Sequence, residues 1–342
     1  MVKSTLRDVK QKDGTFIIPA DTTQLSLADH SMGGSGMGVP GARRLAFALK
    51  EGWMVNRGED GTPIVSIDIS GNKIGPDGAT KLFGALPGGR AGSLTELDAS
   101  GNDIGPEGGI KALNTALRAE GCGSSLVKLS LGRNGLGDEG ALLLANTLKQ
   151  GALPKLQRLF LTRNGIGNEG AELLAAAFKS APLVAVHLNA NHIGDKGAIE
   201  IANALKALDV PPTLKSLLLT DNRIGDAGAV AIGTALAKPT SAASNLAELG
   251  LGKNLITSHG CASLAHALAS PGAKAITSLS LDDNDAIPHS QLHNFHELLN
   301  LPFAKRAAAK NLQAEPIQIP AKYVPAIVAV AAVILFILAK LF

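Results

Sequence analysis

Three histidines, His289, His293 and His296, have the most metal-like spacing in the chain. On a helix, positions i, i+4 and i+7 lie along one face, and histidine nitrogens are common zinc ligands. The alternative is a polar helix face that covers one end of the fold. We favour the polar face, because no carboxylate or cysteine is evident at ligand spacing on it, and we therefore expect no metal site.

Motifs of common enzyme classes do not occur in the sequence. It contains no G-x-x-x-x-G-K-[ST] phosphate loop, no H-E-x-x-H zinc motif and no G-x-S-x-G nucleophile motif. Acidic residues recur at regular intervals, as the structural positions of a repeat do, whereas an active site would break that regularity. We therefore expect no enzymatic activity, no catalytic residue and no cofactor.

Seven residues between positions 128 and 218 have types that favour protein binding. Arginine and aromatic side chains are enriched among the few residues that carry most of an interface's binding free energy. If the fold collects the seven on one surface, they form a basic patch with apolar groups in it, suited to a protein partner with an acidic surface. They are Lys128, Arg133, Arg158, Phe160, Arg163, His187 and Leu218.

The segment 126–148 shows which elements would position these residues. Leu129 and Leu131 belong to an L-x-x-L-x-L pattern, whose alternation predicts a short strand. Asn134 follows at the turn, and Leu144 and Leu148 then repeat at helical spacing. One strand–helix unit cannot bury its apolar face alone, so it requires copies of itself on both sides.

The copies are marked by a column of asparagines spaced 27 to 32 residues apart. A buried Asn amide can satisfy backbone groups where a strand ends, and an unpaired group there would be costly. The members of the column are Asn72, Asn102, Asn134, Asn164, Asn191, Asn222, Asn254 and Asn284.

An Ile-Gly or Leu-Gly pair follows most of these asparagines, and the next residue is of a type that suits a helix start. We therefore expect these next residues to begin the helical half of each repeat. They are Pro76, Pro106, Asp138, Asn168, Asp195 and Asp226.

Together these columns resemble the leucine-rich repeat family, and within it the long-repeat, ribonuclease-inhibitor-like class. The resemblance covers roughly residues 22–299. It implies an α/β solenoid shaped as a horseshoe, with a parallel sheet on the concave side and helices on the convex side. We divide the chain into an N-terminal cap with a degenerate first repeat (1–63), about eight repeats (64–299), a linker (300–321) and a membrane anchor (322–342).

In such a sheet, residues between and just after the apolar strand positions point into the concave face. In chain order, that face is acidic at its start, basic with exposed apolar groups in its middle, and acidic again at its end. We expect Phe160 to be exposed at the centre, with Arg158 and Arg163 beside it. The alternative is a solvated surface that binds nothing.

Charge, cysteine content and the first residues argue against a nucleic-acid-binding, disulfide-bonded or secreted protein. The formal net charge is +3, and no basic tract with interleaved aromatics is present, so we expect no nucleic-acid partner. The two cysteines, Cys122 and Cys261, lie in separate repeats, which argues against a disulfide and for a reducing compartment. The first residues contain no apolar run, so no secretory signal is expected.

The end of the sequence predicts a membrane anchor. Residues 323–339 carry no charge and lie between Lys322 and Lys340. A helix over 320–342 would be roughly 34 Å long, enough to span a bilayer's apolar core. Tyr323 suits the interface, the lysines can reach the headgroups, and Phe336 lies in the apolar run. The alternative is a helix packed against the repeats.

These features predict a single-pass, tail-anchored protein with its repeats facing the cytosol. We favour the mitochondrial outer membrane, with the endoplasmic reticulum as the alternative. The function we favour is a membrane-tethered scaffold that binds a protein partner on the concave face. A second hypothesis is an accessory structural subunit of a large organellar membrane complex. A third is a small-GTPase regulator, because Ran GTPase-activating proteins have similar repeats, although no catalytic residue can be transferred from them.

Overall fold

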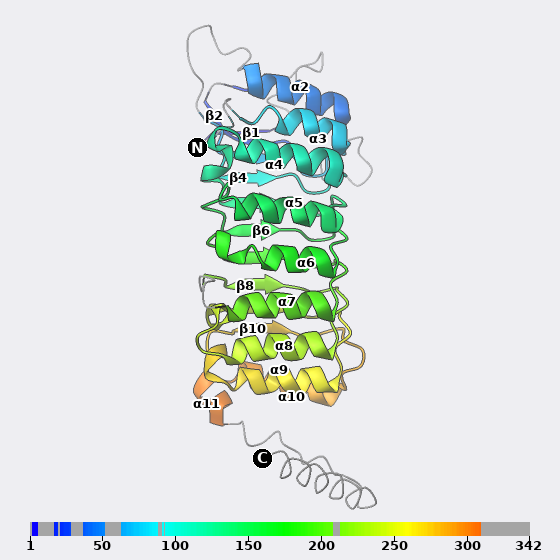
Figure 1. Cartoon of the computed structure of the whole chain (residues 1–342), viewed down its shortest axis with the longest axis vertical. Helices are drawn as coiled ribbons and strands as arrows, with labels where there is room; N and C mark the ends of the chain where they lie inside the picture. The colour runs from blue at the N-terminus through cyan, green and yellow to red at the C-terminus, as the bar shows by residue number, and fades with distance from the viewer. Residues whose placement is uncertain are drawn as a thin grey trace, which may run out of the picture.

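The fold is a solenoid with a sheet on one side and helices on the other (Figure 1). The sheet contains ten strands that are parallel and lie in chain order, as stacked repeats require. The predicted α/β repeat solenoid with a parallel sheet is therefore confirmed. The computed structural model describes residues 2–5, 17–19, 21–28, 37–51, 63–87, 91, 93–207 and 213–308.

Most strands are three residues long, and these pair with their neighbours in direct register. The central residue of each is buried against the helices, as Leu159 is in β6, while the two outer residues point away from them. We call the surface made by these outer residues the open face. The strands are β1 Val2–Thr5, β2 Thr22–Ser26, β3 Ser66–Asp68, β4 Glu96–Asp98, β5 Lys128–Ser130, β6 Arg158–Phe160, β7 Ala185–His187, β8 Ser216–Leu218, β9 Glu248–Gly250 and β10 Ser278–Ser280.

The helices stack in one layer, and their buried Leu, Ile and Ala side chains meet the strand leucines in a thin, continuous core. In one repeat a π-helical turn, η1 Gly105–Ile110, precedes the α-helix. The helices are α2 Gly38–Glu51, α3 Gly75–Phe83, α4 Lys111–Arg118, α5 Gly137–Lys149, α6 Asn168–Ala175, α7 Asp195–Lys206, α8 Asp226–Ala237, α9 Ser258–Leu268, α10 His289–Asn300 and α11 Phe303–Ala308. Shorter 3-10 turns are η2 Ala119–Ser125, η3 Phe178–Ser180, η4 Ala242–Asn245 and η5 Pro271–Ala273.

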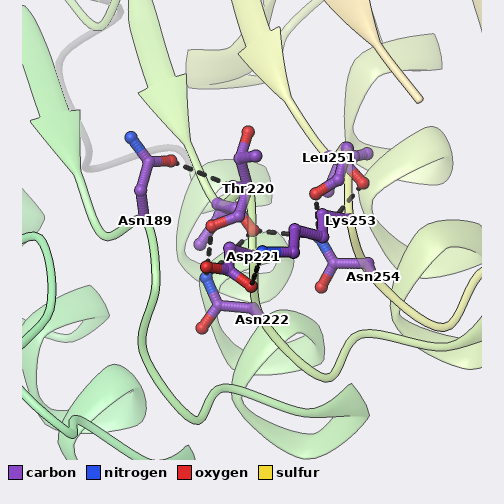
Figure 2. Close-up of polar contacts among 9 residues, drawn as sticks. Asn189, Thr220, Asp221, Asn222, Leu251, Lys253 and Asn254 are labelled. Atoms are coloured by element: carbon purple, nitrogen blue, oxygen red, sulfur yellow. Dashed lines mark hydrogen bonds and ion pairs between the residues drawn. The ribbon is translucent and has the colours of Figure 1, made fainter. Parts of the chain in front are cut away.

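The asparagine column forms a buried ladder that joins neighbouring repeats. Figure 2 shows two of its members, Asn222 and Asn254, at the ends of their strands. Asn254 donates from Nδ2 to the carbonyl oxygens of Leu219 and Leu251, both at 3.0 Å. Its Oδ1 accepts the N–H of Ile224 at 3.0 Å. Each amide thus satisfies strand-end backbone groups, as the sequence predicted. These groups lie in its own repeat and in the one before it, which the sequence did not show.

A second ladder runs along the starts of the helices. Asp195 Oδ1 accepts the N–H groups of Gly225 and Gly228, both at 2.8 Å, which are the first groups of the following helix, α8. Asp138, Asn168 and Asp226 bind α6, α7 and α9 in the same way. These residues stand at the starts of their own helices, as expected. The sequence did not show that their side chains also cap the next repeat's helix.

The last repeat is closed by a residue that the sequence did not single out. Arg306 in α11 is 6% exposed, and its Nε donates to the Leu301 carbonyl at 2.8 Å. Its NH1 and NH2 groups both donate to the Ile276 carbonyl at 3.1 Å, just before β10. Burial lowers the pKa of this guanidinium. Arg306 therefore ties α11 to the carbonyl that precedes β10, the last strand.

Arg306→Ala should lower the free energy of unfolding by about 3 kcal/mol, because it removes hydrogen bonds from a charged donor and uncovers a buried carbonyl. Lys305→Ala, at the exposed neighbouring position, is the matched control and should change it by less than about 0.5 kcal/mol. Urea unfolding followed by circular dichroism measures both variants. Equal midpoints for the two would show that Arg306 does not close the stack.

The N-terminal strand β1 was not predicted, because its polar sequence lacks the leucine pattern. Its Ser4 hydroxyl lies 2.7 Å from the Thr22 hydroxyl in β2, and both residues are buried.

Both cysteines, Cys122 and Cys261, are buried and free, and burial raises the pKa of each thiol to about 11. Such thiols are largely protonated at neutral pH and react slowly.

Within the described residues, no helix combines the length and the apolar content needed to cross a membrane. The predicted anchor, 322–342, lies outside the described residues, and so do its membrane residues Lys322, Tyr323, Phe336 and Lys340.

Candidate functional site

Strand register aligns the open-face side chains into rows that run across the strands. One row passes through Glu96, Lys128 and Arg158. The adjacent row contains Phe160, His187 and Leu218 at matching positions of β6, β7 and β8. The structure therefore brings five of the seven predicted binding residues onto two neighbouring rows.

The centre of the predicted patch is a stacked pair of rings. The Phe160 and His187 ring centroids lie 4.4 Å apart with an interplanar angle of 24°. The Lys128 Nζ lies 6.0 Å from the Phe160 centroid, at the outer limit of a cation–π contact. The sequence predicts an exposed Phe160. In the structure this residue is half-buried, because His187 covers one side of its ring. The two rings therefore form one stacked aromatic cluster on the open face.

Arg158 is not a free cation. Its NH2 atom lies 3.2 Å from the Glu96 carboxylate, across the intervening strand β5, and the two side chains are 44% and 42% exposed. An exposed pair of this kind contributes little to stability, but it neutralises one of the charges counted in the basic patch. The remaining permanent positive charge in the predicted set comes from Lys128, Arg133 and Arg163.

Arg133 and Arg163 lie on the turns that follow β5 and β6, not on the strands. Both are exposed and adopt left-handed backbone conformations, with φ of 56° and 58°. Their N–H groups donate to the Thr162 and Asn189 carbonyls of the next repeat. They therefore form the margin of the patch.

His187 is held in a polar network that the sequence did not reveal. Its Nε2 lies 3.5 Å from the Ser216 hydroxyl, which itself donates to the Glu248 carboxylate at 2.6 Å. Burial lowers the pKa of His187, and the nearby Glu248 opposes that shift only in part. The imidazole is therefore mainly neutral at pH 7, and it adds ring surface more than charge to the patch.

A shallow hollow lies at the start of the open face, before the aromatic pair. Its volume is about 210 Å³. Three carboxylates line it, together with Lys3 on β1 and Lys128 on β5. The acidic start of the face that the sequence predicted is therefore a concave surface. The carboxylates belong to Asp68, Glu96 and Asp98.

Comparison with known families agrees with this geometry. Six segments of the chain match the family model described as Leucine Rich repeat, at residues 62–83, 93–111, 124–145, 152–175, 179–202 and 210–233. This chain is a leucine-rich repeat protein. The family prediction is therefore confirmed. A search of curated proteins found no match.

Three solved structures have a similar fold at low sequence identity. In the crystal structure of the Rad7 and Elc1 complex in yeast, the matched chain is 16% identical, with a TM-score of 0.45, and the alignment covers 80% of this chain and 66% of that one. In the crystal structure of the TLR13–ssRNA13 complex, the matched chain is 17% identical, with a TM-score of 0.34, and the alignment covers 75% of this chain and 35% of that one. In the crystal structure of a TDR receptor, the matched chain is 16% identical, with a TM-score of 0.32, and the alignment covers 81% of this chain and 47% of that one. This repeat protein thus spans between about a third and two thirds of each matched chain.

The three histidines of this repeat protein lie on and around the exposed face of α10. His293 Nε2 lies 3.3 Å from the Glu297 carboxylate, and His296 Nε2 lies 3.6 Å from Asp282. These two carboxylates were missed, since one comes from the turn after β10. Nowhere in the described part of the chain do three or more His, Cys, Asp or Glu side chains meet in a way that could hold a metal ion.

Proposed function

We propose that this leucine-rich repeat protein is a non-catalytic scaffold whose open face binds a protein partner. The observation that supports the proposal most is the stacked Phe160–His187 pair, a half-buried aromatic surface at the centre of the sheet. Rigid aromatic surfaces surrounded by charged side chains are typical of the residues that dominate binding energy. The repeat length of 27 to 32 residues further supports assignment to the ribonuclease-inhibitor-like class and a horseshoe curvature.

The partner's chemistry follows from the groups around the aromatic pair. Lys128 lies beside Phe160, while Arg133 and Arg163 extend from the adjacent turns. These three cations would attract an acidic surface and make association faster at low salt. The pairing of Arg158 with Glu96 makes this attraction weaker than the sequence alone implied.

Phe160→Ala should weaken capture of partners by about tenfold to a hundredfold, since it removes the ring on which His187 stacks and a contact would centre. The measurement is quantitative capture from cell lysate with purified full-length protein, followed by titration of the main captured protein. Leu142→Ala on α5, a 38% exposed apolar position on the helical side, is the control and should leave capture unchanged. An unaltered set of captured proteins with Phe160→Ala would refute the proposed site.

We also propose, from the uncharged run between Lys322 and Lys340, that the chain is tethered by residues 322–342 to an organelle membrane, with the repeats in the cytosol. Deletion of residues 320–342 should move a chain tagged at its N-terminus from the carbonate-resistant membrane fraction to the soluble fraction. If the full-length chain is already soluble, there is no tether. Co-imaging with outer-membrane and endoplasmic-reticulum markers would decide between the two membranes.

A further inference from the structure

The open-face row that contains Phe160 also contains two neighbouring carboxylates. Asp68 in β3 pairs in register with Asp98 in β4, so the two side chains lie about one strand spacing, 4.8 Å, apart. Both line the hollow at the start of the face. From Asp68 onward, the row passes through Asp98, Ser130, Phe160, His187 and Leu218.

Local hydrogen bonds fix both carboxylates. Asp68 Oδ1 accepts the N–H of Ser70, and Asp98 Oδ1 accepts the N–H of Ser100, each at 3.0 Å. Only one oxygen of each carboxylate is used in this way. The two side chains are therefore held side by side with acceptor capacity left for a ligand.

The neighbouring charges do not neutralise this pair. Glu96, the third carboxylate of the hollow, is bound to Arg158. Lys128 also lines the hollow, but its ammonium lies over the Phe160 ring, on the β6 side of its own strand. Lys3 belongs to β1, two strands from Asp68. Among the described residues, neither Asp68 nor Asp98 forms an ion pair.

Ser130 lies on the row between the carboxylates and the aromatic pair. It is 3% exposed, and its hydroxyl finds no hydrogen-bond partner within the described part of the chain. A buried hydroxyl without a partner is costly, so a polar group that reached it from a bound segment would gain free energy. An unsatisfied polar atom therefore lies midway along the row.

We propose that this row binds an extended protein segment that places a Lys or Arg side chain between Asp68 and Asp98 and an apolar or aromatic side chain on the Phe160–His187 pair. The inference rests on the proposed function. It adds one basic side chain to a partner whose acidic groups meet Lys128, Arg133 and Arg163. Two adjacent carboxylates bind a guanidinium well through paired, charge-assisted hydrogen bonds. They repel phosphate, which makes a nucleic acid the wrong occupant.

Strand spacing sets the separation of the two ligand side chains. Asp98 and Phe160 are two strands apart, and Asp98 and His187 are three, which corresponds to about 10 to 14 Å. An extended segment advances about 3.3 Å per residue, so the cation and the apolar side chain are three or four residues apart. The recognised pattern is a Lys or Arg followed or preceded at that distance by Phe, Leu or a similar residue.

The test uses three fluorescein-labelled peptides in a Gly/Ser background that differ at one position. Arg, Ala or Glu stands four residues before a Phe, and fluorescence polarisation measures binding to the full-length protein. The Arg peptide should bind about fivefold more tightly than the Ala peptide, the gain expected of exposed charge pairs, and the Glu peptide more weakly than both. High salt should reduce the difference.

The double variant Asp68→Asn with Asp98→Asn should abolish the preference for Arg and leave the Ala peptide's affinity unchanged. Asparagine keeps the oxygen that accepts the Ser70 or Ser100 N–H, so the turns are retained. Asp77→Asn is the control: it removes an exposed carboxylate on α3, outside the row, and should leave the preference for Arg unchanged. Phe160→Ala should weaken the Arg and Ala peptides equally.

The outcomes separate this inference from the proposed function. An Arg peptide that binds no better than the Ala peptide, or a preference that survives the double variant, overturns the inference. No binding of any peptide at millimolar concentration overturns it as well. The scaffold proposal fails separately, if Phe160→Ala leaves lysate capture unaltered.

Discussion

Asn164→Ala should lower the free energy of unfolding by about 3 kcal/mol, the largest effect we expect from a single side chain in the repeats. Asn164 Oδ1 accepts the N–H of Asn134 at 2.9 Å, and this buried N–H would lose its acceptor. Its Nδ2 donates to the carbonyls of Leu131 and Leu161, both at 3.0 Å, and each would keep one other amide donor. An unpaired buried N–H costs about 1–3 kcal/mol, and the weakened carbonyls and the small cavity add to it.

Urea unfolding monitored by circular dichroism measures this effect. Because Asn164 joins neighbouring repeats in mid-stack, the variant should also broaden the transition, as the two halves begin to unfold separately. Asn203→Ala on α7 is the matched control: that amide is exposed and contacts only Glu200 at 3.4 Å, so its loss should change stability by less than about 0.5 kcal/mol. Similar losses for the two variants would show that the ladder does not hold the repeats together.

The asparagine ladder could be predicted because it depends on the repeat period alone. When the strands stack in register, an Asn at a fixed distance from three strand leucines lies at the same strand end in every repeat. The second ladder was not predicted, because its residues were assigned only to the starts of their own helices, whereas their side-chain oxygens accept N–H groups of the next repeat's helix. Asp138 and Gly167 are 29 residues apart, yet they share a hydrogen bond of 2.6 Å.

The residue at the acceptor position explains a change of turn geometry along the stack. Pro106 offers no side-chain acceptor, so the next repeat's Gly137 takes a positive φ of 58° and donates to the Asn164 carbonyl. Asp138 does offer one, so Gly167 stays extended, with φ of −97°, and donates to that carboxylate. The Leu-Gly and Ile-Gly pairs look equivalent in the sequence. The difference comes from the repeat before.

The part of the candidate site that follows from strand alternation could be predicted from the sequence. Alternation placed Phe160, His187 and Leu218 on the open face, and register then aligned them. It could not show that Arg158 reaches Glu96, 62 residues earlier, or that His187 stacks on Phe160. Such contacts depend on which rotamer each long side chain adopts. They changed both the charge of the patch and the exposure of its central ring.

Asp226 should make the stability of the C-terminal repeats depend on pH. It accepts hydrogen bonds from the Thr257 N–H at 2.8 Å, the Gly260 N–H at 2.9 Å and the Thr257 hydroxyl at 2.6 Å. Partial burial acts to raise the pKa of this carboxyl, but the hydrogen bonds outweigh burial and leave the pKa below its ordinary value. A carboxyl whose pKa is lowered by folding stabilises the folded state when it is ionised. The stabilisation by Asp226 is therefore complete above the pKa that its carboxyl has in the unfolded chain, about 4. It is lost as the pH falls through the lower pKa that the carboxyl has in the folded protein.

Asp226→Ala should consequently lower the free energy of unfolding by about 2 kcal/mol at pH 7, and by progressively less as the pH is lowered below 4. Chemical unfolding of both proteins at pH 7, 4 and 3 measures the narrowing difference. Asp226→Asn is the matched control, because Asn168 performs the same task two repeats earlier with an amide, accepting the Gly194 and Gly197 N–H groups at 2.8 and 2.9 Å. It should retain most of the stability at pH 7. A constant difference between wild type and Asp226→Ala from pH 7 to pH 3 would mean that the side chain's charge has no part in holding α9 to α8.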